Sequence, residues 1–281
     1  MNKEGFIEMD KQFNTRSMIF TLYGDYVRHY GSVIWIGSLI KLLKEFGHNE
    51  QSVRAAISRM SKQGWVKSEK RGNKSYYSLT EQGKARMEEA SKRIYKSESP
   101  KWDGNWRILV YNIPENKRRL RDELRKELVW SGFGNLSNSC WITPNPLEEQ
   151  IHRMVDKYGI RDYVTYFSAS YEGMSHPKTL VDKCWDLNEV NEKYSQFIKE
   201  YSEKYYIDQN LIQKGEVSDG TCFVKCASLV HQYRKFLFID PNLPEELLPD
   251  RWLGNSAATL FNDYHDLLQP RATRFFENVF E

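Results

Sequence analysis

The sequence predicts a multidomain α+β chain with three modules in succession. Three observations predict this: the length of 281 residues, the confinement of excess positive charge to the first third, and a change of hydrophobic periodicity from one third to the next. A chain of this length usually divides into two or three domains. We expect domains over residues 11–96, 102–172 and 178–281, with "SESPKW" as the first linker.

Composition limits the class of protein. Hydrophobic residues make up 40% of the chain and aromatic residues 14%, which is ample for packed cores. No apolar run approaches the length needed to cross a bilayer, and the first twelve residues lack the apolar segment of a secretory signal. We therefore expect a soluble, cytoplasmic protein with no membrane partner.

The charge distribution singles out the first module. From Lys11 to Lys96 there are 17 Lys and Arg against 7 Asp and Glu, whereas residues 97–281 hold 23 against 28. A basic module attached to a mildly acidic body indicates a polyanionic partner at one end of the chain. A solvated basic surface without a partner is the alternative.

The first module is expected to combine three helices with a hairpin. Apolar spacing and turn residues predict helices over residues 15–27, 35–46 and 50–63 and hairpin strands over 65–70 and 75–79. Asn49 is the expected N-cap of the third helix, and Arg71-Gly72-Asn73-Lys74 forms the hairpin tip. This order is typical of a winged helix-turn-helix, and a small helical bundle with an incidental hairpin is the alternative.

The third helix would carry small and basic side chains on its outer face. In the major groove of duplex DNA, such residues reach base edges and phosphates. The basic tip of the hairpin would touch the adjacent backbone or the minor groove. The candidate DNA-binding residues are Gln51, Ser52, Arg54, Ser58, Arg59, Lys62, Arg71, Asn73 and Lys74.

The other two modules differ in their periodicity. Residues 102–172 alternate strands and helices in the order β-α-β-β-α-β, which is typical of a ferredoxin-like domain. Residues 178–281 show helical apolar spacing and form the expected C-terminal, mostly helical domain.

Motifs of catalysis and metal binding are missing from the sequence. There is no P-loop, no GxSxG elbow and no HExxH pattern. Cys222 and Cys226 stand four apart, but no neighbouring histidine or cysteine pair completes a zinc site, so buried thiols are favoured. We expect no catalytic residue, no metal and no cofactor, although clustering of distant side chains in space stays open.

Four segments of the sequence resemble those of a known protein family. They are "SVRAAISRMSKQGWV", "GNKSYYSLTEQG", "WDGNWRILVYNIPENKR" and "LVHQYRKFLFIDPNLPEELLPDRWLG". Together they resemble the PaaX-like family of bacterial transcriptional repressors of phenylacetate degradation, across all three modules. The resemblance implies a homodimeric repressor bound to a double-stranded operator, which would be an inverted repeat if the dimer is two-fold symmetric. It also implies release by an aryl-acyl-CoA effector such as phenylacetyl-CoA.

A CoA thioester needs cations for its phosphates and an apolar slot for its acyl group. His231, Tyr233, Arg234 and Trp252 are the candidate effector-binding residues, although aromatic residues on helices are more often part of a core.

The middle module also resembles small CRISPR-associated ferredoxin-like nucleases. Their metal-binding aspartate falls here on Asn112, and a neutral amide is a poor ligand for a hard divalent cation. A dimerisation or scaffold role is therefore the expectation for this domain. A metal-dependent nuclease targeted by a winged helix is the alternative function, and a protein that only bridges other proteins is a weaker one.

Overall fold

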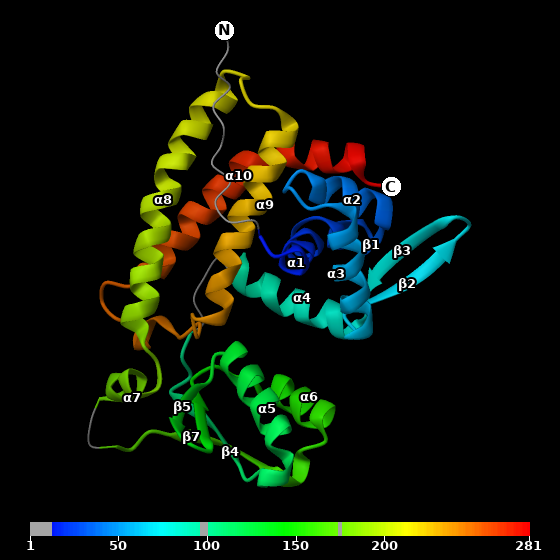
Figure 1. Ribbon diagram of the computed structural model, residues 1–281. Helices are drawn as coiled ribbons and strands as arrows, with labels where there is room; N and C mark the ends of the chain where they lie inside the picture. The colour runs from blue at the N-terminus through cyan, green and yellow to red at the C-terminus, as the bar shows by residue number, and fades with distance from the viewer. Residues whose placement is uncertain (1–12, 96–100, 174–175) are drawn as a thin grey trace. The chain divides into compact units, whose positions relative to one another are not determined.

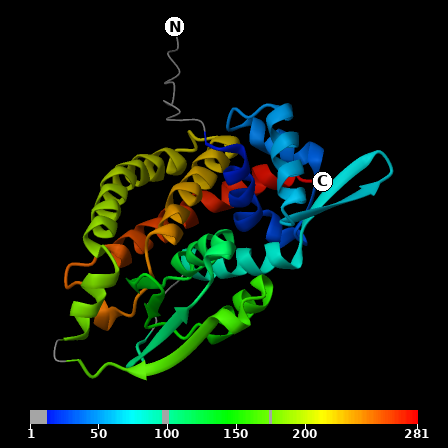
Figure 2. The same ribbon diagram turned by 60° about the horizontal axis from the view of Figure 1, so that its bottom comes forward.

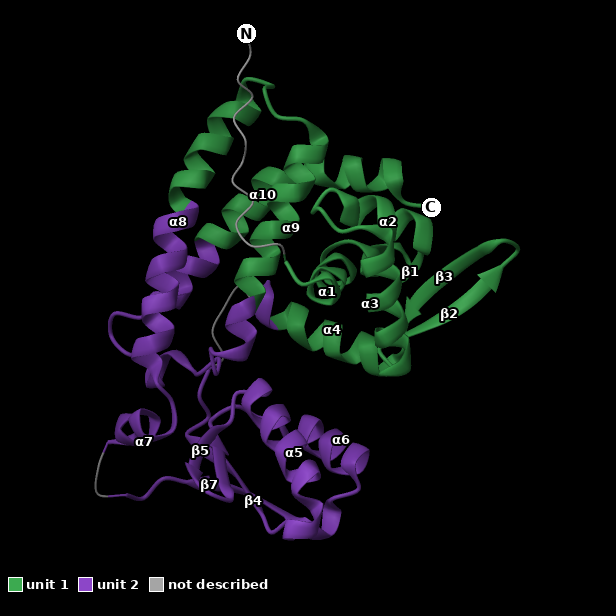
Figure 3. Cartoon of the chain, viewed as in Figure 1, with its two compact units in different colours: residues 1–92, 202–234, 260–281 green, residues 93–201, 235–259 purple. Residues whose placement is uncertain are grey.

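The computed structural model describes residues 13–95, 101–173 and 176–281 (Figures 1 and 2). The chain forms two compact units, shown in Figure 3. The first unit joins residues 1–92 with 202–234 and 260–281, and the second joins 93–201 with 235–259. Each unit thus takes in part of the expected C-terminal domain. The "SESP" portion of the expected linker lies outside the described residues.

The first unit contains the basic module and parts of the C-terminal helices. Its elements are α1 (Thr15–Asp25), η1 (Val27–Tyr30), β1 (Val33–Trp35), α2 (Ile36–Lys44), α3 (Glu50–Lys62), β2 (Val66–Arg71), β3 (Lys74–Leu79), most of α4 (Glu81–Ile94), the end of α8 (Leu187–Gln213), α9 (Asp219–Tyr233) and most of α10 (Gly254–Val279). Helices α1, α2 and α3 have the order that the sequence predicts.

Strands β1, β2 and β3 form an antiparallel sheet in the order β1-β3-β2. The hairpin register pairs Val66 with Leu79 and Arg71 with Lys74, so each strand reaches one residue further toward the tip than predicted and leaves a two-residue turn. Gly72 has a φ of 58°, and a glycine at this first turn position suits the twist of a two-residue hairpin. Figures 1 and 2 show this hairpin projecting beyond the helices of the unit.

Strand β1 is absent from the prediction, which starts the second helix at Trp35. The strand spans three residues and pairs with β3 through Ile34 and Tyr77, so its pattern is too short to show alternation. Trp35 is its last residue and precedes α2.

Helix α1 is the centre of the first unit's core. Met18, Ile19, Leu22 and Tyr23 are fully buried because α3 packs on one side of the helix and α9 on another. A helix that is apolar around most of its circumference is typically buried in this way. The basic module therefore shares its core with helices from the far end of the chain.

The second unit contains a four-stranded sheet and the helices around it. Its elements are β4 (Asn105–Tyr111), η2 (Glu115–Lys117), α5 (Arg118–Trp130), β5 (Gly134–Ser137), β6 (Cys140–Thr143), α6 (Glu148–Tyr158), η3 (Arg161–Tyr163), β7 (Val164–Ser170), α7 (Pro177–Cys184), the start of α8, η4 (Arg234–Phe238), η5 (Glu245–Leu247) and the start of α10. The order β-α-β-β-α-β over β4 to β7 is the one that the sequence predicts.

The sheet is antiparallel in the order β5-β6-β4-β7, with β4 in the interior. Leu109 and Tyr111 face one core, formed with α5 and α6, while Trp106 faces a second core with Val181 of α7 and Leu247. Because β4 is covered on both faces over most of its length, it reads in the sequence as a nearly continuous apolar run.

Arg107 is the buried charge of this sheet. Its guanidinium pairs with Asp103 at 2.6 Å and with Glu148 at 3.1 Å, and it also donates to the carbonyl of Pro144. The hydrogen bond from Arg107 lowers the pKa of Asp103 to about 2. The buried arginine is thus fully paired, as buried charges must be.

The C-terminal segment breaks where the sequence suggests continuity. The apolar stripe from residue 180 to 206 divides into α7 and α8 at Trp185 and Asp186, because Asp186 accepts from the backbone N–H of Glu189 and starts a new helix. Among the described helices, none is both long enough and apolar enough to span a membrane.

Candidate nucleic-acid interface

Helix α3 presents one buried and one exposed face. The side chain of Asn49 accepts a hydrogen bond from the backbone N–H of Ser52 at 2.8 Å, which caps the helix as predicted. Val53, Ala56, Ile57 and Met60 are buried on the inner side. The predicted outer residues Gln51, Arg54, Ser58, Arg59 and Lys62 are all exposed.

Two of the predicted contact residues on α3 already have partners. Arg54 Nε lies 2.7 Å from Glu50 Oε1, one turn earlier on the exposed surface. Ser52 is half-buried, and its hydroxyl donates to the carbonyl of Asn49 at 2.8 Å. An exposed ion pair such as Arg54–Glu50 contributes only about 0–1 kcal/mol, so a phosphate can displace the glutamate.

Arg59 and Lys62 are the exposed cations at the C-terminal end of α3. Within the described part of the chain, neither side chain makes a hydrogen bond or an ion pair. They lie three residues apart and therefore on the same side of the helix. These two side chains are available to an external anion without breaking an internal contact.

The basic residues of the hairpin form ion pairs within the chain. Arg71 donates to both carboxylate oxygens of Glu69 at 3.0 Å and lies over the ring of Tyr76. Lys74 pairs with Glu281 at the end of the chain and lies 4.5 Å from the ring centroid of Trp35. Asn73 is exposed in the turn. In the protein without DNA, these ion pairs partly neutralise the positive charge of the hairpin tip.

Two further lysines lie on the exposed edge strand of the hairpin. Lys67 and Lys70 belong to β2, in which every residue after Val66 is exposed. The strand is predicted from the sequence, but its two lysines are not among the predicted contact residues. The run "KSEKRGNK" holds four basic residues in eight, and this local density could have indicated a basic hairpin.

His231 of α9 and Arg234, the residue that follows α9, contact α1. His231 Nδ1 lies 3.0 Å from the hydroxyl oxygen of Thr21, and Arg234 donates to the carbonyl of Ser17 at 3.0 Å. Burial lowers the pKa of Arg234 to about 10. Its Nε is buried without a hydrogen-bond partner among the described residues. These two side chains join α9 to the basic module.

The other two effector candidates have different surroundings. Tyr233 is buried and stacks on Phe261 of α10, with ring centroids 4.1 Å apart. Trp252 belongs to the second unit, where its ring meets Tyr194 edge to face. His231 and Tyr233 therefore face different helices, and Trp252 stands in the other compact unit.

The end of β4 bears on the nuclease alternative. Asn112 follows the strand, is exposed, and donates its backbone N–H to the carbonyl of Tyr163 at 2.8 Å. Among the described residues, the metal-ligating side chains that cluster in threes or more do not come from this domain. Among the described residues of the middle domain, nothing supports a metal-dependent nuclease.

Comparison with known families covers nearly the whole chain. Residues 14–83 match the family described as PaaX-like protein, residues 99–181 the PaaX protein central Cas2-like domain, and residues 185–278 the PaaX-like protein C-terminal domain. A curated relative, the transcriptional repressor PaaX of Escherichia coli strain K12, is 34% identical over 262 residues, covering 92% of this chain and 82% of the relative.

A solved structure has a similar fold. The uncharacterized protein Rv0674 from Mycobacterium tuberculosis superimposes with a TM-score of 0.55 at 23% identity, covering 93% of this chain and 98% of its own. Fold and charge define a multidomain α+β protein with one strongly basic module. The three successive family matches identify it further: the chain belongs to the PaaX-like family.

Proposed function

We propose that this chain is a DNA-binding transcriptional repressor of a phenylacetate-type catabolic operon, that it acts in the cytoplasm, and that it is not an enzyme. The similarity to a curated transcriptional repressor over 92% of the chain supports the class. The observation that carries the DNA-binding role is the pair of exposed cations Arg59 and Lys62, free of internal partners among the described residues, on a helix followed by a basic hairpin.

In this proposal the basic module acts as a winged helix-turn-helix. Helix α3 enters the major groove, where its exposed side chains reach base edges and phosphates. The β2–β3 hairpin lies along the neighbouring backbone. The proposed contact residues are Gln51, Ser52, Arg54, Ser58, Arg59, Lys62, Arg71, Asn73 and Lys74, to which Lys67 and Lys70 are added.

A homodimer is part of the proposal. Two copies related by a two-fold axis would place their α3 helices in successive major-groove faces about 34 Å apart, which requires an inverted-repeat operator. Light scattering coupled to size-exclusion chromatography, on the protein alone and with operator DNA, measures the number of protein chains in each species.

The proposed effector is phenylacetyl-CoA or a related acyl-CoA, with His231, Tyr233, Arg234 and Trp252 as candidate contacts. The hydrogen bonds that join His231 and Arg234 to residues of α1 support a route from effector to DNA. A ligand that binds these two side chains would weaken their hydrogen bonds to α1. Because α1 packs directly against α3, the position of α3 would then change as well.

The salt dependence of binding tests the DNA interface. Each phosphate contact releases counterions, so the logarithm of the binding constant falls linearly with the logarithm of salt concentration. Lys62→Ala is expected to reduce the magnitude of this slope by about 1, which corresponds to the loss of one phosphate contact. Lys126→Ala, at an exposed ion pair on α5, is the matched control and should leave the slope unchanged. Equal slopes for Lys62→Ala and the wild-type protein would remove this part of α3 from the interface.

A further inference from the structure

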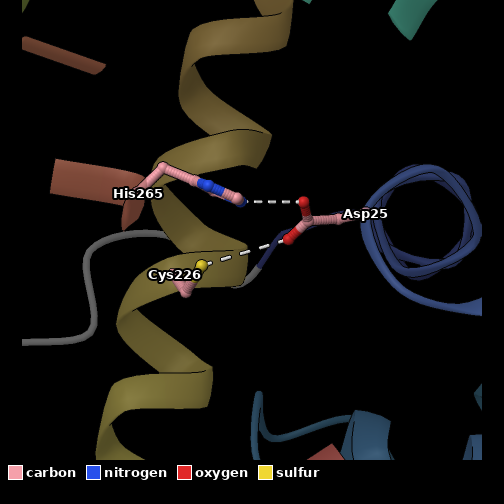
Figure 4. Close-up of side chains that lie close together, drawn as sticks. All are labelled: Asp25, Cys226 and His265. Atoms are coloured by element: carbon pink, nitrogen blue, oxygen red, sulfur yellow. Dashed lines mark hydrogen bonds and ion pairs between the residues drawn. The ribbon is translucent and has the colours of Figure 1, made fainter. Parts of the chain in front are cut away.

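Three metal-ligating side chains from different helices meet in the first unit (Figure 4). Asp25 ends α1, Cys226 lies in α9 and His265 lies in α10, and one ligand atom of each lies within 4.8 Å of the other two. His265 Nε2 is 3.0 Å from Asp25 Oδ1, and Cys226 Sγ is 4.0 Å from Asp25 Oδ2. We refer to these side chains as the Asp25–Cys226–His265 cluster.

We propose that the Asp25–Cys226–His265 cluster binds one divalent transition-metal ion of the zinc type. Carboxylate, thiolate and imidazole are the ligands that zinc takes in proteins. Ca²⁺ and Mg²⁺ prefer oxygen ligands alone, so the thiol and the imidazole select against them. Three protein ligands leave the fourth tetrahedral position to water or to an exogenous ligand.

The spacing of the cluster suits such an ion. Zinc bonds of about 2.0–2.3 Å in a tetrahedron hold ligand atoms roughly 3.3–3.7 Å apart. His265 Nε2 lies 3.0 Å from Asp25 Oδ1, and Cys226 Sγ lies 4.0 Å from the other carboxylate oxygen, Oδ2. With one ligand atom taken from each residue, all three atoms lie within 4.8 Å of one another, somewhat wider than a zinc site. Side-chain movements of about an ångström would complete the coordination. Asp266 Oδ1 lies 3.8 Å from the other ring nitrogen of His265, beyond hydrogen-bonding distance. It is on the side where metal-ligating histidines commonly donate to a carboxylate.

The cluster is buried, so an uncompensated charge in it would be costly. The side chains of Asp25 and His265 are 4% and 13% exposed, and Cys226 is fully buried. Without metal, His265 Nε2 and Asp25 Oδ1 are hydrogen-bonded to each other at 3.0 Å.

The metal-bound cluster is electrically neutral. A divalent ion bound by one carboxylate, one thiolate and one neutral imidazole leaves no net charge. Binding therefore releases the thiol proton of Cys226 and any proton that His265 carries on the ligating nitrogen, and transfers no electrons. The buried site thus accommodates the ion without an uncompensated charge, and the competing interpretation is a permanent, metal-free ion pair.

The position of the cluster gives the ion a structural consequence. It would join α1 of the basic module to α9 and α10, all within the first unit. An ion that binds the folded chain and not the unfolded one stabilises the folded state by mass action. Metal supply would then adjust the rigidity of the same helix α1 that His231 and Arg234 contact.

Cobalt binding tests this proposal on the full chain after removal of metal by a chelator. Co²⁺ titration should produce thiolate-to-cobalt charge-transfer absorption that saturates at one equivalent per chain and is abolished by Zn²⁺. Cys226→Ser should lose this absorption. Cys222→Ser is the matched control, because this thiol is also buried in α9, one turn earlier, and lies outside the cluster. It should retain the absorption.

A second pair of variants keeps the thiol in place. Asp25→Asn and His265→Gln should each weaken cobalt binding at least 10-fold, with circular dichroism confirming the fold. No charge-transfer absorption in the wild-type chain, or absorption that persists in Cys226→Ser, would overturn the proposal. If Cys226→Ser does not fold, wild-type affinity in Asp25→Asn and His265→Gln would overturn it equally.

Discussion

At the scale of single residues, the candidate DNA-binding side chains differ in whether they form ion pairs within the chain. Arg54 and Arg71 are held by nearby glutamates and Lys74 by Glu281, whereas Arg59 and Lys62 make no such contacts among the described residues. Binding by the first group replaces one carboxylate partner with a phosphate, which reduces the gain. The free pair should therefore contribute most per side chain.

Arg59→Ala should weaken operator binding by at least about 1 kcal/mol, because a charged contact to a base or phosphate is lost without a compensating internal change. Fluorescence anisotropy with labelled operator at one fixed salt concentration measures the effect. Arg54→Ala, which also frees Glu50, is the comparison within the same helix and should cost less. Unchanged affinity in a folded Arg59→Ala protein would contradict the assignment.

Asp103 gives a prediction about pH. Its folded-state pKa of about 2 lies below the ordinary value near 3.9 because Arg107 hydrogen-bonds to it. The stability from this pair is therefore fully present above about pH 4 and is lost as pH falls toward about 2. Asp103→Asn should unfold at lower urea concentration than wild type at pH 7, and the gap should narrow as pH falls from 4 to 2. A gap that is constant over this range would refute the coupling.

Sequence alone could not identify several of these partners. The pairs Lys74–Glu281 and Arg234–Ser17 join positions more than 200 residues apart. Local patterns encode which face of a helix is apolar, and they do not encode which distant segment covers it. For the same reason, the Asp25–Cys226–His265 cluster looks like three isolated residues in the sequence.

At the scale of elements, strong periodicity and capping predict the structure well. Helix α3 has its buried positions and its Asn49 cap where the sequence places them, because a 3.6-residue apolar repeat fixes the inner face. The order of strands and helices in the middle domain follows from the same patterns. Strand β1 escapes prediction because three residues give no usable alternation, and pairing with β3 determines it.

The cap of α3 should be worth about 1 kcal/mol, since the Asn49 side chain satisfies one of the free N–H groups of the first turn. Asn49→Ala is expected to lower the free energy of unfolding by that amount in urea titrations, whereas Asn49→Ser should retain most of it. If both variants unfold like the wild-type protein, the cap contributes no stability and this local account is wrong.

At the scale of the whole molecule, the sequence divides differently from the compact units. The three-domain division remains a prediction, and the family matches follow the same succession along the chain. In the structure, α9 and most of α10 share a core with the basic module, with Tyr26 stacked on Phe276. A ligand bound to the C-terminal segment would therefore act on helices that pack directly against α1.

Arg234→Ala tests this contact. We expect operator affinity within about threefold of wild type, while the acyl-CoA concentration for half-release rises about 10-fold, a size typical of coupling between sites. Lys214→Ala, an exposed lysine after α8, is the control for loss of a positive charge and should release normally. Normal release by Arg234→Ala would exclude this residue from the effector response.

The most direct measurement is fluorescence anisotropy of the full chain on the DNA upstream of its own gene, against a scrambled duplex of equal length at the same salt concentration. Phenylacetyl-CoA is then added to the complex. The repressor account predicts selective binding of the upstream duplex and its reversal by the thioester. Equal, weak binding to both duplexes, unaffected by the ligand, would contradict it.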